Sequence, residues 1–246
     1  MEKDKLLRLD NEMGLMEFLK EPTVKIAEAL TGIFSSGVTN WKLSAGRLVQ
    51  ACIKGDLLTQ LGREMEKYRN EGKIKEDYFA SRKNRATLFE LLQFLDEEIP
   101  DDDLFRALKS IFFCGISVGA TNNDEVLAYE FLKTAKKLSG TEILILRASF
   151  EIAQKKFLQD VSESELALGV DQRNMWRKVI AKQMGYESLD SIVFKYEENL
   201  EILGLIQPRF TEINLARFAK TPYFRLTNTG YKFCEFIMSY DDPLEN

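Results

Sequence analysis

The spacing of apolar residues along the chain is that of helices almost everywhere. Residues 40–70 carry an apolar side chain at nearly every third or fourth position, which predicts one long helix that Thr39 caps and Gly72 ends. The same spacing predicts a second helix over residues 75–98. Shorter helical segments are expected before residue 40. The pattern therefore predicts a mainly α fold.

Two further helix starts follow in the centre of the chain. Pro100 and the three aspartates after it begin a helix that runs into the uncharged stretch 110–123, because carboxylates suit the positive end of a helix. Gly115 and Gly119 in that stretch predict the close approach of another helix. The turn 122–124 is expected to cap the next helix, which runs to residue 138.

Ser139 and Glu142 have the spacing of a capping box, which opens an apolar helix to about residue 158. We expect a domain boundary just before this box. It divides the chain into a helical domain over residues 1–138 and a second domain over residues 139–246.

The second domain reads as a winged-helix-like module with a two-stranded wing. Apolar spacing predicts helices near 172–184, ended by Gly185, and over 189–203, ended by Gly204. Alternation and turn residues predict two short strands and a closing helix after them. These three elements span residues 205–210, 223–227 and 228–240.

The sequences LGLI at 203–206 and LT-x-x-G at 226–230 resemble the end of many winged-helix domains. Together with DEEIPDDDLFRALKSIFF and NNDEVLAYEFLKTAKKLSGTEILIL, they resemble the Abi-alpha-type proteins, a bacterial family linked to abortive infection and mobile elements. The resemblance covers about residues 90–236. It implies a role in phage defence and assigns no catalytic residue.

Winged helices often bind DNA by placing the helix before the wing in the major groove. Here that helix, residues 189–203, has a net charge of −3, so phosphates are expected to repel it. The segments of the module with a local excess of basic residues are the wing and the helix near 172–184. A DNA-binding alternative therefore rests on Arg173, Arg177, Lys178, Lys182, Arg209, Arg217, Lys220 and Arg225.

The composition excludes several classes of chemistry. The chain of 246 residues contains no histidine, which removes Ser-His-Asp and Cys-His nucleophiles and histidine metal sites. Phosphate-cradling glycine motifs are missing from the sequence. The acidic residues Glu97, Glu98 and 101–103 are better explained as helix-terminal charge than as a cation site. No catalytic residue, metal ligand or cofactor is assigned.

The three cysteines, Cys52, Cys114 and Cys234, lie far apart among apolar residues and are expected to be buried thiols. The stretch 110–123 is too short to span a membrane, and the N-terminal residues do not have the pattern of a signal peptide. We therefore expect a cytoplasmic, non-enzymatic bacterial or mobile-element protein. It would act through a protein partner or self-association, with a DNA-binding regulator as the alternative.

Overall fold

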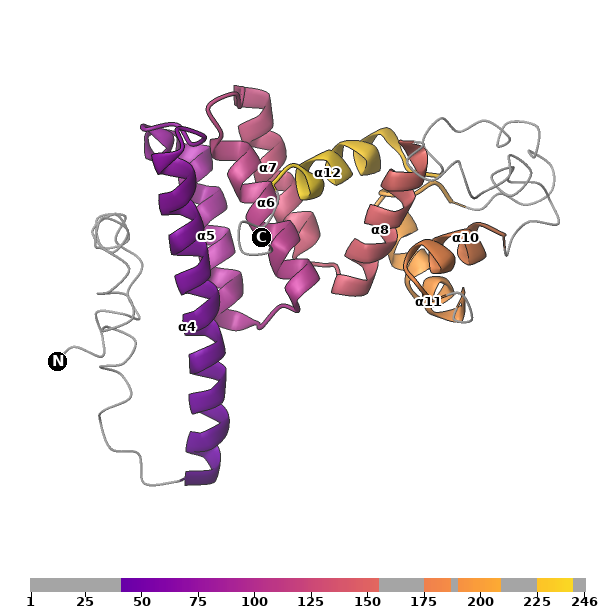
Figure 1. The fold of residues 1–246 in the computed structure, drawn as a ribbon, viewed down its shortest axis with the longest axis horizontal. Coiled ribbons are helices and arrows are strands. Elements are labelled where there is room, and N and C mark those ends of the chain that lie inside the picture. The colour runs from indigo at the N-terminus through magenta and orange to yellow at the C-terminus, as the bar shows by residue number, and fades with distance from the viewer. Residues whose placement is uncertain (1–40, 155–174, 187–189, 209–224, 241–246) are drawn as a thin grey trace. The chain divides into compact units, whose positions relative to one another are not determined.

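The computed structural model describes residues 41–154, 175–186, 190–208 and 225–240, without the side chains of residues 41–52, 175 and 190 (Figure 1). This part of the chain is mainly helical. Of the described residues, 41–78 and 92–99 form one compact unit, and 79–91 and 100–240 form another. The helices are α4 (Trp41–Asn70), α5 (Arg82–Glu97), α6 (Asp102–Ile116), α7 (Asn122–Ala135), α8 (Gly140–Ala153), α10 (Met175–Gln183), α11 (Asp190–Ile202) and α12 (Asn228–Met238).

The first unit is built on α4, the long helix predicted over residues 40–70. It ends as expected before Gly72, whose φ of +66° is accessible to glycine at little cost. Lys54 on α4 donates a hydrogen bond to the backbone carbonyl of Asp96 near the end of α5. The buried apolar residues of this unit are Leu61, Tyr68, Ile74, Phe94 and Leu95. Thr39, the predicted cap of α4, lies outside the described residues.

The prediction of one helix over residues 75–98 was wrong at its start. A short 3₁₀ turn, Tyr78–Ala80, precedes α5, which begins only at Arg82. The hydroxyl of Ser81 accepts a hydrogen bond from the backbone amide of Asn84 at 3.4 Å and donates one to Glu125 at 2.6 Å. Ser81 therefore caps α5. Its side-chain oxygen accepts an amide of the first helical turn, which has no carbonyl partner within the helix.

The acidic segment before α6 serves helix ends, as the sequence favoured. Asp101 is the N-cap of α6 and accepts the amide of Leu104 at 2.9 Å. Its other carboxylate oxygen accepts the amide of Gly140, the first residue of α8, at 3.0 Å. One carboxylate thus caps two helices, and Asp103 lies 3.6 Å from Arg147 of α8.

Close packing of α7 on α6 depends on Gly115, as predicted. A Cβ at Gly115 would lie 2.7 Å from the Cβ of Ala128 on α7, too close for any larger residue. Gly119 lies beyond the end of α6 and has open space around it, so only the first glycine of the pair allows the approach.

The cap of α7 was predicted at residues 122–124, but it lies one residue earlier. Thr121 is the N-cap of α7, and its hydroxyl and backbone amide form a capping box with Asp124. The threonine side chain supplies the acceptor that the first turn lacks, so α7 already begins at Asn122.

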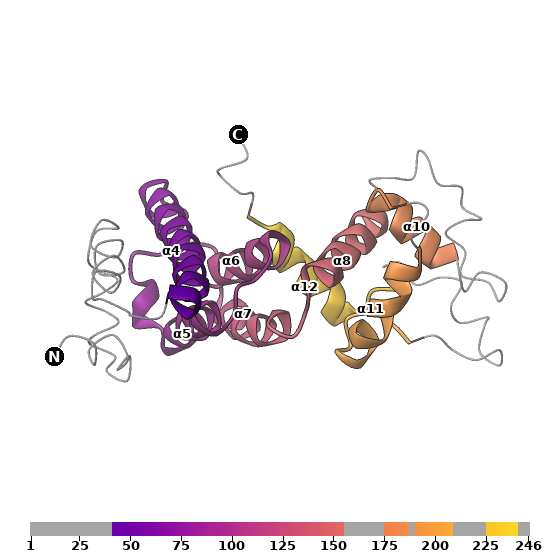
Figure 2. The same ribbon diagram turned by 90° about the horizontal axis from the view of Figure 1, so that it is seen from below.

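Ser139 and Glu142 form the predicted capping box at the start of α8. Beyond it, α12 crosses between α6 and α8, and α10 and α11 pack against each other and against α8 (Figures 1 and 2). Phe131 of α7 makes edge-to-face contacts with Phe233 and Phe236 of α12, at centroid distances of 5.4 and 5.1 Å. Packing of α12 on α6 joins chain segments on both sides of residue 139, and the boundary placed there stays a prediction.

The two predicted strand segments meet at one antiparallel bridge, Ile206 with Leu226. The amide of Gln207 donates to Arg225 at 2.7 Å, and that of Thr227 donates to Leu205 at 3.1 Å. The ends of the two segments are therefore paired. Residues 209–224 lie outside the described part of the chain, and the two-stranded wing stays a prediction.

The LGLI and LT-x-x-G sequences form one junction between α11 and α12. The hydroxyl of Thr227 accepts the amide of Gly230 at 2.8 Å and donates to the carbonyl of Gly204 at 2.7 Å. A Cβ at Gly230 would overlap the carbonyl oxygen of Leu205. The junction therefore requires glycine at residue 230, which ties the start of α12 to the end of α11.

Candidate interaction surface on helices α10 and α11

The helix α11 is held to α8 through a buried carboxylate. Glu142 belongs to the α8 capping box through one oxygen, and its other oxygen accepts the side-chain amide of Asn199 at 2.6 Å. The same Asn199 amide lies 3.4 Å from the carbonyl of Lys137. Because Glu142 is buried, these bonds fix the position of α11 on the underlying helices.

Two carboxylates of α11 enclose the guanidinium of Arg225, the last residue before the bridge to Ile206. Arg225 donates to Glu197 and to Glu201, each at 2.6 Å, and to the backbone carbonyl of Gln207 at 2.7 Å. Only 4% of Arg225 and of Glu197 is exposed, so the ion pair is buried. A buried pair with this many bonds is costly to break, because the partner left behind is a charge out of contact with water.

Arg225 also adopts a left-handed backbone conformation, with φ of +68°. This conformation is unfavourable for any residue with a Cβ and is maintained only where the surroundings determine it. The hydrogen bonds to Glu197, Glu201 and Gln207 are those surroundings.

The network extends to α10 through a second arginine. Arg177 donates to the other carboxylate oxygen of Glu197 at 2.9 Å, and its guanidinium lies 4.0 Å from the ring centroid of Phe194. Glu197 thus joins Arg177 of α10 to Arg225 across the buried side of α11. The pairing explains why a helix rich in acidic residues packs against basic neighbours.

The structure places the eight candidate nucleic-acid residues in three different settings. Arg225 is buried, and Arg177 is engaged with Glu197 and Phe194, so the fold occupies both guanidinium groups. Lys178 and Lys182 are exposed, one turn apart on α10. Outside the described residues lie Arg173, Arg209, Arg217 and Lys220.

The exposed side of α11 carries two large apolar side chains and two charged side chains of opposite sign. Phe194 is 60% exposed and Ile202 is 75% exposed, the latter the most exposed large apolar side chain among those described. Lys195 and Glu198 are the exposed charged residues between them. The net charge of −3 counted from the sequence therefore does not describe this face, because Glu197 and Glu201 are paired inside the fold.

Sequence reasoning did not identify Phe194 and Ile202 as surface residues. Both occur in a run of apolar residues at helical spacing, which looks like a core stripe when read alone. The two differ from the core residues Val193 and Leu200 by one or two positions in the same helix. Only the packing of α11 on α8 and α10 separates the two faces.

The thiols are not poised for nucleophilic chemistry. Burial raises the pKa of the Cys114 thiol to about 11, and it raises the pKa of Cys234, which is fully buried, further still. Cys114 is only half-buried, contrary to expectation, and the side chain of Cys52 is not described. Both described thiols remain protonated at neutral pH and are therefore poor nucleophiles.

Within the described ranges, no group of three or more cysteine, aspartate or glutamate residues is arranged to hold a metal ion. Nor does any helix there combine the length and the apolar composition needed to cross a bilayer. Comparison with protein-family models, with curated proteins and with solved structures gave no match.

Proposed function

We propose that this protein is a non-enzymatic interaction protein that binds another protein surface through the exposed side of α11. The observation that carries this proposal is the pair Phe194 and Ile202, which expose large apolar side chains on one helix face. Exposed apolar groups bounded by charged ones are typical of protein contact sites. The balanced charges Lys195 and Glu198 give this face little attraction for a polyanion.

A winged-helix-like arrangement of the C-terminal part is included in the proposal. The order α10, α11, antiparallel bridge and α12 supports it, because a wing would leave α11 at Ile206 and return at Leu226. The proposed place of action is the bacterial cytoplasm, in phage defence or on a mobile element. This last part rests on the sequence resemblance to the Abi-alpha-type proteins alone.

The test compares the full chain with a double variant, Phe194→Glu with Ile202→Glu. Sedimentation velocity over a wide concentration range measures self-association, and pull-down from a bacterial lysate, with and without phage challenge, measures binding to another protein. We expect the double variant to lose the complex that the parent chain forms. Val126→Glu, a change of an exposed apolar residue on α7, is the matched control and should retain it. Equal complex formation by the double variant and the parent contradicts the proposal.

The second candidate function is a DNA-binding regulator. The exposed pair Lys178 and Lys182 on α10 favours it, because two lysines one turn apart can contact adjacent phosphates. Changing both to glutamine should then abolish a gel shift with duplex DNA and reduce the dependence of binding on salt. Changing Arg225 would unfold the site and is not informative here. Absence of a shift at low salt rejects this candidate.

A further inference from the structure

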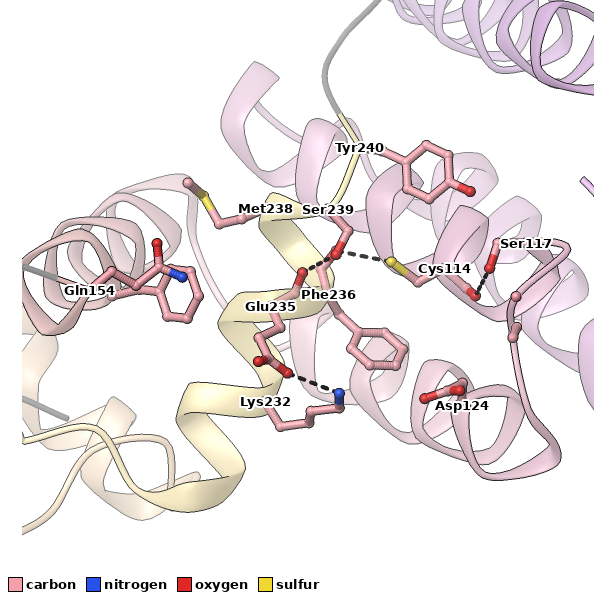
Figure 3. Close-up of a pocket in the computed structure, with 13 residues that line it drawn as sticks. Cys114, Ser117, Asp124, Gln154, Lys232, Glu235, Phe236, Met238, Ser239 and Tyr240 are labelled. Atoms are coloured by element: carbon pink, nitrogen blue, oxygen red, sulfur yellow. Dashed lines mark hydrogen bonds and ion pairs between the residues drawn. The ribbon is translucent and has the colours of Figure 1, made fainter. Parts of the chain in front are cut away.

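A cavity of about 620 Å³ opens in the second compact unit (Figure 3), and no residue of α11 lines it. It lies where α6, α8 and α12 end and where α7 begins. Residues from all four helices and from the α6–α7 turn line it.

Three helix C-termini converge on this cavity. Ser117, Gln154 and Ser239 are the C-cap residues of α6, α8 and α12, and all three line it. None of these helices has a basic residue in its last turn. Each C-terminus carries roughly half a negative charge from its aligned peptide dipoles. No lysine or arginine in those last turns compensates these three ends. They outnumber the one positive helix end at the cavity, the N-terminus of α7, so the helix dipoles leave an excess of negative potential there.

The charged side chains add to this excess. Asp124 and Glu235 contribute carboxylates, whereas Lys232 is the one cation among the described lining residues. Lys232 pairs with Glu235 at 2.9 Å, and its ammonium group lies 5.6 Å from the ring centroid of Phe236. The chain's own lysine therefore already shows the contacts that this cavity offers a cation, a carboxylate beside an aromatic face.

The rest of the lining is mixed, with apolar and aromatic side chains beside the polar Ser117, Gln154 and Ser239. Phe150, Phe236, Met238 and the ring of Tyr240 line the cavity, and Figure 3 shows Phe236 and Lys232 on the same stretch of α12. Cys114 adds no charge, because burial raises its thiol pKa to about 11. Such walls suit the hydrocarbon stem of a ligand whose charged end lies against the carboxylates.

We propose that this cavity binds an organic cation, an ammonium or guanidinium group on an apolar stem. The ligand is either a small free amine or a lysine or arginine side chain of a partner. The convergence of three uncompensated helix C-termini with two carboxylates and aromatic walls carries the inference. It stands independently of the proposed contact surface on α11, since the two sites share no residue.

The experiment titrates the full chain by calorimetry with n-butylammonium, n-butylguanidinium, n-butanol and a blocked Gly-Lys-Gly peptide. We expect both cations to bind, weakly and less well at high salt, and the neutral alcohol of the same shape to bind at least tenfold more weakly. Binding of the peptide at least as tight as that of the free amines assigns the site to a protein side chain, and tighter binding of the amines assigns it to a small molecule. Equal binding of alcohol and amine, or no binding of any cation, overturns the proposal.

Two variants test the geometry. Glu235→Gln should weaken n-butylammonium binding about threefold to tenfold, because it removes an exposed carboxylate partner. Lys232→Gln should strengthen it, because the resident ammonium competes for the same carboxylate. Glu130→Gln is the matched control, since Glu130 pairs in the same way with Lys133 beside Tyr129, outside the cavity. A loss of affinity in Lys232→Gln, or an unchanged affinity in Glu235→Gln, contradicts the assignment.

Discussion

The guanidinium of Arg225 lies over the indole of Trp176, 4.5 Å from the ring centroid. Trp176 is almost completely buried, so the arginine is packed against α10 on one side and bonded to carboxylates of α11 on the other. Contact with an aromatic face combined with two carboxylate partners is a use of arginine that lysine cannot reproduce. Arg225 is therefore a structural residue of this unit.

Replacing Arg225 with methionine should destabilise the protein by about 3–5 kcal/mol, because it leaves Glu197 buried with one of its two cationic partners missing. Urea denaturation followed by circular dichroism measures the change. The methionine stem retains contact with Trp176, so the loss reports on the charge.

Two further variants test whether the loss of stability in Arg225→Met comes from the buried charge. Adding Glu197→Gln to the Arg225→Met chain should recover part of the lost stability, because the stranded carboxylate becomes neutral. Lys178→Met, an exposed change on α10, should alter stability by less than about 0.5 kcal/mol. If the arginine variant is as stable as the lysine variant, the buried network does not stabilise the fold.

Gly230→Ala should destabilise by more than about 3 kcal/mol or prevent folding, because the new methyl group overlaps the backbone oxygen of Leu205. The backbone cannot yield easily there, since Thr227 bonds both Gly204 and Gly230. Thermal unfolding measures the effect. Gly119→Ala, with open space around it, serves as control and should change stability by less than about 0.5 kcal/mol. Similar melting temperatures for the two variants would refute the close approach.

The two capping boxes should differ in their sensitivity to substitution. Ser139→Ala and Thr121→Ala should each cost about 1 kcal/mol, the usual value of an N-cap. Glu142→Ala should cost about 1 kcal/mol more than Asp124→Ala, because Glu142 also accepts the amide of Asn199 from α11. Chemical denaturation of the four single variants gives the comparison. Equal losses for Glu142→Ala and Asp124→Ala would mean that the contact with Asn199 contributes nothing.

Alkylation of the thiols should report their burial. With a pKa of about 11, only roughly one part in a thousand of Cys114 is thiolate at pH 8, so iodoacetamide should modify it slowly and about tenfold faster for each pH unit up to that value. Cys234 should react only after unfolding, because its pKa is raised further and no solvent reaches it. Mass spectrometry of a Cys52→Ser chain follows both sites. Rapid modification of either thiol at neutral pH would contradict the packing of α12.

Helix ends were the features most readable from the sequence. Gly72, Gly185 and Gly204 were expected to end helices, and all three adopt positive φ. The Ser139 capping box was also correct. Each of these signals depends only on residues a few positions apart, so the sequence alone is enough to recognise it.

Contacts between distant residues were not readable in this way. Asp101 caps α8 through Gly140, which lies 39 residues further along the chain. Arg225 was counted as surface charge, although pairing with Glu197 and Glu201 removes it from the surface. The charges of an isolated helix do not reveal which of them the fold will neutralise. The apolar spacing of α11 likewise does not reveal which apolar side chains stay exposed, so Phe194 and Ile202 were not recognised.

The position of α12 affects how this unit is made on the ribosome. Phe233 and Phe236 complete the core around Phe131, and Ser110 of α6 bonds the carbonyl of Phe236 across 126 positions of sequence. The earlier helices emerge with that core unfilled, so stable folding must wait until synthesis has passed residue 238 and the segment has left the exit tunnel. Until then the nascent chain exposes an apolar surface that chaperones are suited to cover.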